Sequence, residues 1–236
     1  MLGTPRLHLR EVDSTNARAQ RLAAGGAAHG TLVTAAQQRA GHGRQGRAWV
    51  TPPGRALACS LVLREPPRLL PMLAALAVAE VADRFDAADR RAMIKWPNDV
   101  LLDGRKVAGI LAEGRPQEGW VVLGVGLNVA VTEDDLPREL RAVAASLGCA
   151  PSALESALDA LLERLEHWLA ATPEQAMEAY RARDALAGRE ISWSGGRGTA
   201  LGIADDGRLR VQPTASGEEL LLDAGEVHLG SAPTGR

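Results

Sequence analysis

The stretch KWPNDVLLDGRKVAGILAE, residues 95–113, contains the only two lysines of the chain, Lys95 and Lys106, beside twenty-five arginines. A lysine ammonium is a compact charge on a flexible stem, whereas a guanidinium is a wide planar fork. By chance alone, a second lysine falls this close to the first about one time in ten. The pattern therefore suggests, without deciding alone, that this stretch needs an ammonium that arginine cannot replace.

A turn signal divides this stretch. Asp103 and Gly104 lie between apolar runs, and both can adopt positive φ, so they predict a two-residue hairpin turn. We therefore expect Lys95 and Lys106 on paired strands. Pro97 has no backbone donor and favours an extended preceding residue, which suits a strand margin or a bulge.

The composition bounds the class of protein. A chain of 236 residues with 46% apolar content, 24% charge and net charge −2 is typical of a globular protein with a large and a small domain. The charge argues against a strongly basic, general nucleic-acid surface. Cys59 and Cys149 have no zinc spacing, and we expect them to be core residues in a reducing compartment. No signal core or spanning apolar run is evident, so we expect a cytoplasmic protein without membrane segments.

The first polar cluster follows a predicted strand. Residues 6–12 alternate as in a half-buried strand, and DSTN at residues 13–16 precedes a predicted helix over residues 17–24, closed by Gly25 and Gly26. A helix cap explains this cluster most simply. Four hydrogen-bonding side chains at a helix start can also hold a polar head group, because the first amides point outward.

The second polar cluster is the loop QQRAGHGRQGRAW, residues 37–49, after a predicted strand over residues 31–36. Its glycines allow close approach of the backbone to a ligand, and Arg44 and Arg47 supply forked donors for phosphate or carboxylate. The loop matches neither a Walker loop nor the dinucleotide fingerprint. Alone, such a loop is a weak signal, and a solvated flexible loop or an RNA-contacting segment is the default interpretation. Trp49 either stacks on a base or anchors the loop to the core.

The rest of the chain predicts a scaffold and a small second domain. Residues 55–64 indicate a buried strand, residues 69–85 a buried helix, and residues 119–131 a strand whose glycines mark a bulge or a close approach. Residues 152–171 predict an amphipathic helix, and TPEQ at residues 172–175 opens another with a capping box. Five short alternating runs follow, which predict an SH3-like barrel with a boundary near residues 185–188: residues 190–193, 199–203, 208–212, 219–222 and 226–229.

Five segments in this order resemble biotin protein ligases: residues 14–16 (STN), 41–49 (GHGRQGRAW), 95–99 (KWPND), 104–110 (GRKVAGI) and 124–128 (GVGLN). The resemblance covers nearly the whole chain. It implies an α+β fold related to class II aminoacyl-tRNA synthetases, with a mixed sheet flanked by helices over residues 1–186 and an SH3-like β-barrel over residues 187–236. It also implies ATP-dependent activation of biotin as biotinyl-5′-AMP with Mg²⁺, and transfer to a lysine of a biotin carboxyl carrier protein or domain.

The resemblance assigns roles to individual residues. Biotin-binding roles fall on Ser14, Thr15, Asn16, Gln38, Gly41, His42, Gly43, Arg44, Lys106 and Gly109. ATP-binding roles fall on Arg44, Arg47, Trp49, Lys95, Asn98, Lys106 and Asn128, and catalytic roles on Lys106, Arg44 and Arg47. Fixed cations, with Mg²⁺ carried by ATP rather than by a protein cage, suit a reaction that builds negative charge at phosphorus.

The chain departs from the family pattern in two places. The family loop commonly reads Gly-Arg-Gly-Arg-x-Gly-Arg, and His42 stands at its first arginine, so we expect weaker retention of the adenylate. The chain begins at the first catalytic strand, without the winged helix of some members, so we expect a ligase that does not bind DNA. The sequence leaves open whether the protein forms a homodimer.

Two alternatives to biotin ligation remain. One is a lipoate or octanoate ligase or transferase of the same superfamily, and the other is a non-catalytic RNA-binding module. The KWPND string and the GRK hairpin favour biotin over lipoate. The net charge of −2 speaks against RNA.

Overall fold

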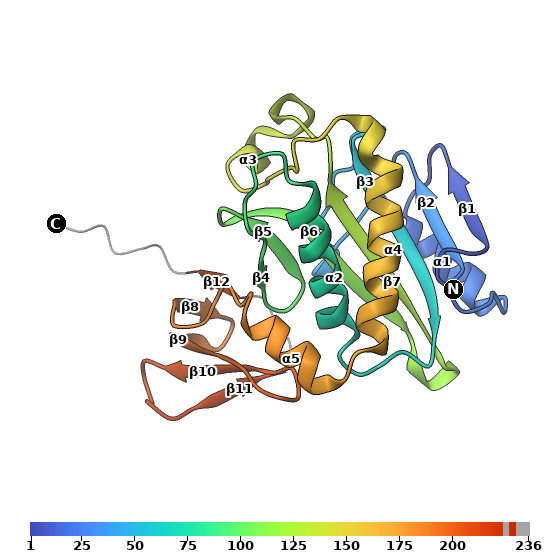
Figure 1. Cartoon of the computed structure of the whole chain (residues 1–236). Coiled ribbons are helices and arrows are strands. Elements are labelled where there is room, and N and C mark those ends of the chain that lie inside the picture. The colour runs from blue at the N-terminus through green and yellow to red at the C-terminus, as the bar shows by residue number, and fades with distance from the viewer. Residues whose placement is uncertain (224–226, 230–236) are drawn as a thin grey trace.

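The computed structural model describes residues 1–223 and 227–229, which form two sheets (Figure 1). The larger sheet has the strand order β1-β2-β3-β7-β6-β5-β4. Only β1 and β2 pair in parallel, so this is the mixed sheet that the resemblance implies. The bounds of its strands are β1 (Arg6–Leu9), β2 (Leu32–Ala35), β3 (Ala56–Arg64), β4 (Met93–Lys95), β5 (Asp99–Leu102), β6 (Arg105–Arg115) and β7 (Trp120–Asn128).

Helices cover both faces of the larger sheet. Helix α1 (Thr15–Ala24) packs Ala19 and Ala23 against one set of strand residues, including Val33 and Val62. The neighbouring strand residues point to the opposite face because successive side chains of a strand alternate. There they meet α2 (Leu70–Phe85) and α4 (Leu154–Ala170), which lie side by side on this face of the sheet (Figure 1). Helix α2 is almost entirely apolar because it packs against both the sheet and α4.

The C-terminal segment forms the smaller, antiparallel sheet. Thr172 begins α5 (Pro173–Arg181) with the predicted capping box. The strands follow in the order β11-β10-β9-β8-β12, with bounds β8 (Glu190–Trp193), β9 (Gly196–Ile203), β10 (Leu209–Pro213), β11 (Leu220–Leu222) and β12 (His228–Leu229). Five strands were expected here, although residue 226 of the last predicted run lies outside the described residues. The arrangement is consistent with an SH3-like domain, and we propose its boundary at residues 186–187.

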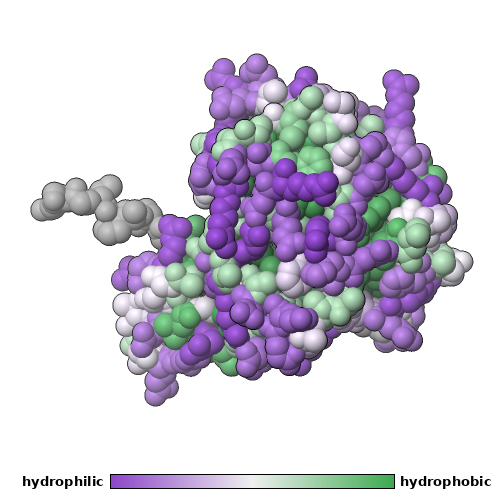
Figure 2. All heavy atoms as spheres, in the orientation of Figure 1, coloured by the Kyte–Doolittle hydropathy of each residue, from purple (hydrophilic) through white to green (hydrophobic). Residues whose placement is uncertain are grey.

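Short helical segments occupy the connections: α3 (Arg138–Arg141) and the 3₁₀ turns η1 (Arg44–Gly46), η2 (Pro116–Glu118), η3 (Glu133–Asp135) and η4 (Pro151–Ala153). Hydrophilic residues predominate on the face shown in Figure 2, as expected when most large apolar side chains pack inside. In the part of the chain that the structure describes, no helix combines the length and apolarity needed to cross a bilayer. Both cysteines are free; Cys59 is buried, which raises the pKa of its thiol to about 12.

The hairpin prediction is confirmed at its turn, where Asp103 and Gly104 have φ of 49° and 74°. The expected pairing of the two lysine strands is wrong. Lys95 ends β4 opposite Asp99, and Lys106 lies on β6, with β5 between the two. The chain reverses over residues 96–98, because Pro97 has no N–H and cannot continue a ladder.

Trp96, inside the KWPND string, joins the two sheets. Its side chain is buried, and its Nε1 donates to the carbonyl oxygen of Gly207 at 3.0 Å. Backbone hydrogen bonds link Ile94 to Arg183 and Ala185 beside it. Trp96 therefore links the smaller sheet to the end of β4, the strand that carries Lys95.

Candidate active site

One pocket of about 280 Å³ collects almost all of the predicted site residues. Its walls come from the start of α1, the glycine-rich loop, β5, β6, β7 and the segment around α3. Predicted residues that line it are Ser14, Thr15, Asn16, Gln38, His42, Gly43, Arg44, Arg47, Trp49, Asn98, Lys106, Gly109 and Asn128. Gly41 and Lys95 do not line it.

Lys106 forms an ion pair inside this pocket. Its Nζ lies 2.7 Å from Asp99 Oδ1 and 5.6 Å from the ring centroid of Trp49. The Lys106 backbone is fixed between Val143 and Ala145, with two hydrogen bonds of 2.8 Å. An ammonium has three donors, so the contact with Asp99 leaves capacity for a ligand. Asp99 belongs to the KWPND motif, but nothing in the sequence around it indicates this contact with Lys106.

Two strand glycines make room for Trp49. Gly109 and Gly126 face each other across β6 and β7. A Cβ at Gly126 would come within 2.4 Å of the indole, and one at Gly109 within 3.2 Å of the Lys106 Nζ. The close approach predicted for the glycines of residues 119–131 is therefore made at Gly126 by the protein's own tryptophan, and Gly109 on the neighbouring strand leaves room for Lys106. The buried Trp49 Nε1 has no hydrogen-bond partner among the described residues.

The glycine-rich loop folds back on itself. Gly43 N donates to Arg47 O at 2.7 Å, and Trp49 N donates to Gly41 O at 2.8 Å. A Cβ at Gly41 would meet Trp49 O at 2.7 Å, so Gly41 is required for the fold of the loop although it does not line the pocket. Arg47 is exposed at the tip of the loop.

Asn98 links this loop to the central strands. Its Nδ2 donates to Ile110 O at 2.9 Å, and its backbone oxygen accepts from Ile110 N at 2.9 Å. Asn98 Oδ1 is thereby held in place and accepts from Arg44 Nη1 at 3.4 Å. The arrangement brings the Arg44 guanidinium to the same pocket as Lys106.

The opposite end of the pocket is polar and ordered by hydrogen bonds. Ser14 caps α1, since its Oγ accepts from Ala17 N at 3.3 Å. Thr15 N and Oγ1 both donate to Gln38 Oε1, at 2.8 Å and 3.0 Å. Gln38 Nε2 donates to Thr51 Oγ1 at 3.2 Å. The capping and ligand-binding interpretations of this cluster are therefore compatible, because Ser14 caps the helix while its neighbours line the pocket.

Asn128 supports the far wall. It is buried, and its Nδ2 donates to Ala145 O at 2.9 Å. This contact holds the segment over residues 143–149, of which Val143 and Ala144 line the pocket.

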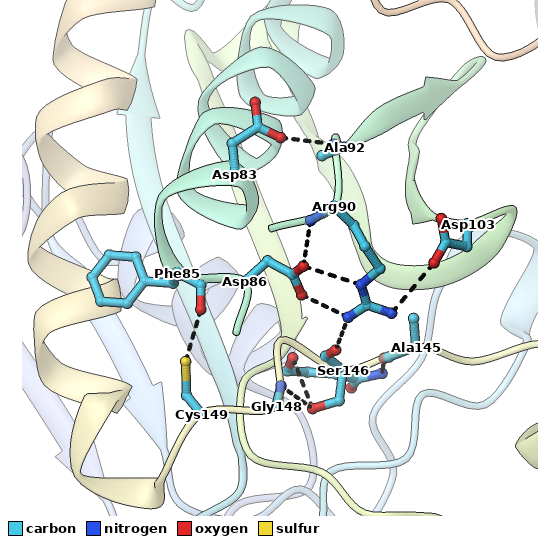
Figure 3. Close-up of polar contacts among 11 residues, drawn as sticks. Asp83, Phe85, Asp86, Arg90, Ala92, Asp103, Ala145, Ser146, Gly148 and Cys149 are labelled. Carbon is cyan, nitrogen blue, oxygen red and sulfur yellow. Dashed lines mark hydrogen bonds and ion pairs between the residues drawn. The ribbon is translucent and has the colours of Figure 1, made fainter. Parts of the chain in front are cut away.

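Behind that segment lies an ion pair that the sequence analysis did not identify (Figure 3). Asp86 accepts from Arg90 at three nitrogens, with distances of 2.6 Å to Nη2, 3.0 Å to Nε and 2.7 Å to the backbone N. Arg90 Nη2 also donates to Ser146 O at 2.8 Å, and Nη1 lies 3.9 Å from Asp103. The Arg90 guanidinium holds the pKa of Asp86 below its usual range. This Asp86–Arg90 brace ties the end of α2 to the pocket wall.

Comparison with known proteins identifies the family. Residues 9–129 match the model of the biotin/lipoate A/B protein ligase family. A biotin–(acetyl-CoA-carboxylase) ligase of Mycobacterium tuberculosis is 34% identical over 234 residues, covering 92% of this chain and 86% of that protein. The chain belongs to the biotin/lipoate A/B protein ligase family. The chain is also 39% identical over 153 residues to another ligase, the bifunctional ligase/repressor BirA of Bacillus spizizenii.

The match to BirA covers 62% of this chain and 47% of that protein, so the chain spans about half the length of this relative. Among solved structures, biotin protein ligase from Aquifex aeolicus in complex with biotin and ATP matches with a TM-score of 0.81 and 26% identity. That match covers 96% of this chain and all of the other. The predicted family and fold class of this family member are therefore confirmed.

Proposed function

We propose that the protein couples biotin to ATP as biotinyl-5′-AMP, releases pyrophosphate, and transfers biotin to a lysine of a carboxylase carrier domain. The observation that carries the proposal is that Lys106 shares one pocket with Arg44 and with the polar cluster around Gln38. The names of the Mycobacterium relative and the Aquifex complex support the substrate, the nucleotide and the carrier. Independence from DNA and a cytoplasmic location stay predictions.

The charges in the pocket suit carboxyl adenylation. A biotin carboxylate oxygen attacks the α-phosphorus of ATP, the bond to pyrophosphate breaks, and negative charge grows at phosphorus and on the leaving group. Fixed cations aimed at that charge stabilise the transition state more than the bound substrates. Lys106 and Arg44 can approach it from two walls, and Arg47 from the loop tip. The protein needs no nucleophile of its own.

Mg²⁺ would enter with the ATP phosphates and neutralise charge on pyrophosphate. Among the described residues that line the pocket, Asp99 is the only carboxylate. One or two protein carboxylates suffice for Mg²⁺ that is bound mainly by phosphates and water. The donor set therefore fits an ion delivered by ATP.

We propose the ligand positions from the two ends of the pocket. Ser14, Thr15, Asn16, Gln38 and His42 contact biotin, with Gly43 allowing its close approach, while Arg44 and Lys106 reach its carboxyl group. Gly41 acts through the fold of the loop, and Gly109 through the room that it leaves for Lys106. Trp49, Asn98 and Asn128 lie beside the nucleotide. Lys95 is outside the pocket lining, so its part in ATP binding is not supported by this geometry.

The family also includes lipoate ligases, which makes lipoate or octanoate the second candidate substrate. The polar end of the pocket favours biotin. A ureido head group offers both N–H donors and a carbonyl acceptor, whereas a dithiolane or an alkyl end offers none. Thr15 is already paired with Gln38, but Gln38 Nε2 has a second hydrogen beyond the one that it donates to Thr51. Burying that hydrogen against such a group would leave it unpaired, at a cost of about 1–3 kcal/mol.

Mass spectrometry tests the proposal. Purified protein with ATP, Mg²⁺ and biotin should yield biotinyl-5′-AMP, and a carrier domain added to the mixture should gain one biotin on lysine. Lys106→Ala is the matched control and should give little of either product. Failure of the wild-type protein to form the anhydride and to label the carrier would refute the proposal.

A further inference from the structure

Glu113, on β6, joins three elements at the polar end of the pocket and has no role in the proposal above. Its Oε2 accepts from Asn16 Nδ2 at 3.0 Å and from Gln20 Nε2 at 3.2 Å, both on α1. The same oxygen lies 3.8 Å from His42 Nε2 on the glycine-rich loop. The His42 contact is longer and about one-third exposed, so the contacts with α1 contribute more.

The carboxylate determines which way the Asn16 amide faces. An ionised carboxylate only accepts hydrogen bonds, whereas an amide has a donor end and an acceptor end. The NH₂ group of Asn16 must therefore face Glu113, and Oδ1 must face away from it. On that side the Oγ of the wholly buried Ser60 lies 2.6 Å from Asn16 Oδ1 and 2.8 Å from Thr15 Oγ1. Asn16 Oδ1 can only accept, so the one hydrogen of Ser60 is donated along the shorter contact to Asn16.

Gly124 on β7 leaves the space that the Asn16 side chain occupies in this orientation. Asn16 is buried, and its Oδ1 lies against Gly124, where a Cβ would come within 2.1 Å. Both Asn16 and Gly124 line the pocket. A carbonyl oxygen has two acceptor sites, and Ser60 uses one. The other is available to a donor in the pocket.

We propose that Glu113 is a positioning residue that fixes the Asn16 carbonyl as an acceptor for an N–H group of a cyclic urea. This inference rests on the proposed function, since the head group of biotin is a cyclic urea. Lipoate and octanoate have no N–H group in that place. The contact between Glu113 and Asn16 therefore contributes to the choice of acid as well as to its affinity.

Titration calorimetry with biotin and desthiobiotin, which keeps the urea ring but lacks the thioether ring, tests the inference. Glu113→Ala should weaken binding of both ligands about tenfold, the usual effect of losing one hydrogen bond to a charged group. The KM for biotin should rise, while the KM for ATP and kcat at saturating biotin should stay unchanged. Asn16→Ala should also weaken binding, and adding Glu113→Ala to it should have no further effect, because the two residues act as one unit.

A polarity swap tests orientation without an alanine cavity. Asn16→Asp keeps an oxygen toward the pocket but places a carboxylate against Glu113, and it should bind biotin at least tenfold more weakly. Asn16→Asp combined with Glu113→Gln supplies a donor to the new carboxylate and should restore most of the affinity. Glu118→Ala is the matched control. Glu118 lies in η2, between β6 and β7, and its carboxylate accepts hydrogen bonds from Arg115 and Trp120. This substitution should leave the affinity for biotin unchanged.

Two results would overturn the inference: wild-type affinity in Glu113→Ala, or no recovery in the swapped pair. These results are distinct from failure of the proposed function. If the wild-type protein binds neither biotin nor desthiobiotin, the proposed function fails and this inference fails with it. If the wild-type protein binds both and Glu113→Ala binds them equally well, only the role of Glu113 is refuted.

Discussion

The Asp86–Arg90 and Asp99–Lys106 ion pairs lie in different environments, and the difference distinguishes a structural ion pair from one that is placed to act on a ligand. Asp86 and Arg90 lie behind the pocket, where the Asp86 side chain is wholly buried and Arg90 contacts it with two side-chain nitrogens. Asp99 and Lys106 lie in the pocket, where Lys106 makes one close contact and is 35% exposed. The planar guanidinium suits a fixed, multiply bonded brace. The compact ammonium keeps donors for a ligand whose charge changes during reaction.

This difference gives a reason why an arginine-rich chain has a lysine in the pocket. An arginine-rich chain that uses Arg90 in its brace still has lysine at position 106. Lys95 does not share that environment, because it ends β4 outside the pocket lining. The prediction that the site needs an ammonium therefore applies to Lys106 and not to Lys95.

The largest effect on stability should come from breaking the brace. Arg90→Ala leaves the buried Asp86 without its partner, and such losses typically cost about 3–5 kcal/mol of unfolding free energy. Urea unfolding measures the change. Arg115→Ala, which removes an exposed ion pair with Glu118, is the control and should lower the unfolding free energy far less, because solvent screens an exposed pair. Equal effects from the two variants would show that the brace has no special structural role.

The pocket pair should show the opposite pattern. Lys106→Arg and Lys106→Ala should both slow pyrophosphate formation by about 10²–10³, equivalent to about 3–4 kcal/mol of transition-state stabilisation. Their thermal unfolding should stay close to that of the wild-type protein, because Lys106 is partly exposed. A wild-type rate for Lys106→Arg would contradict the claim that the site requires an ammonium.

The brace should also govern sensitivity to acid. Arg90 lowers the pKa of Asp86 in the folded protein, so the stabilisation is present above the ordinary aspartate pKa of about 3.9 and is lost as pH falls toward the lower, folded-state value. Unfolding free energy measured between pH 6 and pH 3 should therefore fall less in Asp86→Asn than in the wild-type protein. Parallel curves would show that Asp86 does not contribute to the acid dependence.

The smallest effect should come from Trp96, a motif residue that joins the two sheets. Trp96→Phe keeps most of the packing but removes the hydrogen bond to Gly207, which is worth about 1 kcal/mol. Unfolding free energy should drop by this amount, and the rate of pyrophosphate formation should not change. A rate loss as large as that of Lys106→Ala would place Trp96 in the chemistry instead.

Local patterns predicted the scaffold well. The apolar runs of β3, β7 and α2 and the turn at Asp103 each depend on neighbouring residues, so the sequence alone indicates them. The separation of Lys95 from Lys106 was missed, because the reversal at Pro97 inserts β5 between their strands.

The site was predicted less completely, because its geometry depends on distant partners. Thirteen of the residues that the motif pattern predicted line one pocket in the structure, but the pattern could not show that Trp49 covers Gly126. Asn16 and Glu113 are 97 residues apart, and no local signal joins them. The i,i+4 spacing of Asp86 and Arg90 is such a signal, but it gives no hint of the contact with Ser146.

Pyrophosphate release in the presence of ATP and Mg²⁺, measured with biotin and with octanoate as the alternative acids, tests the central claim most directly. The polar end of the pocket and the Lys106 ammonium predict release with biotin and only background release with octanoate. Release with octanoate but not with biotin would contradict the assignment of this pocket to biotin activation.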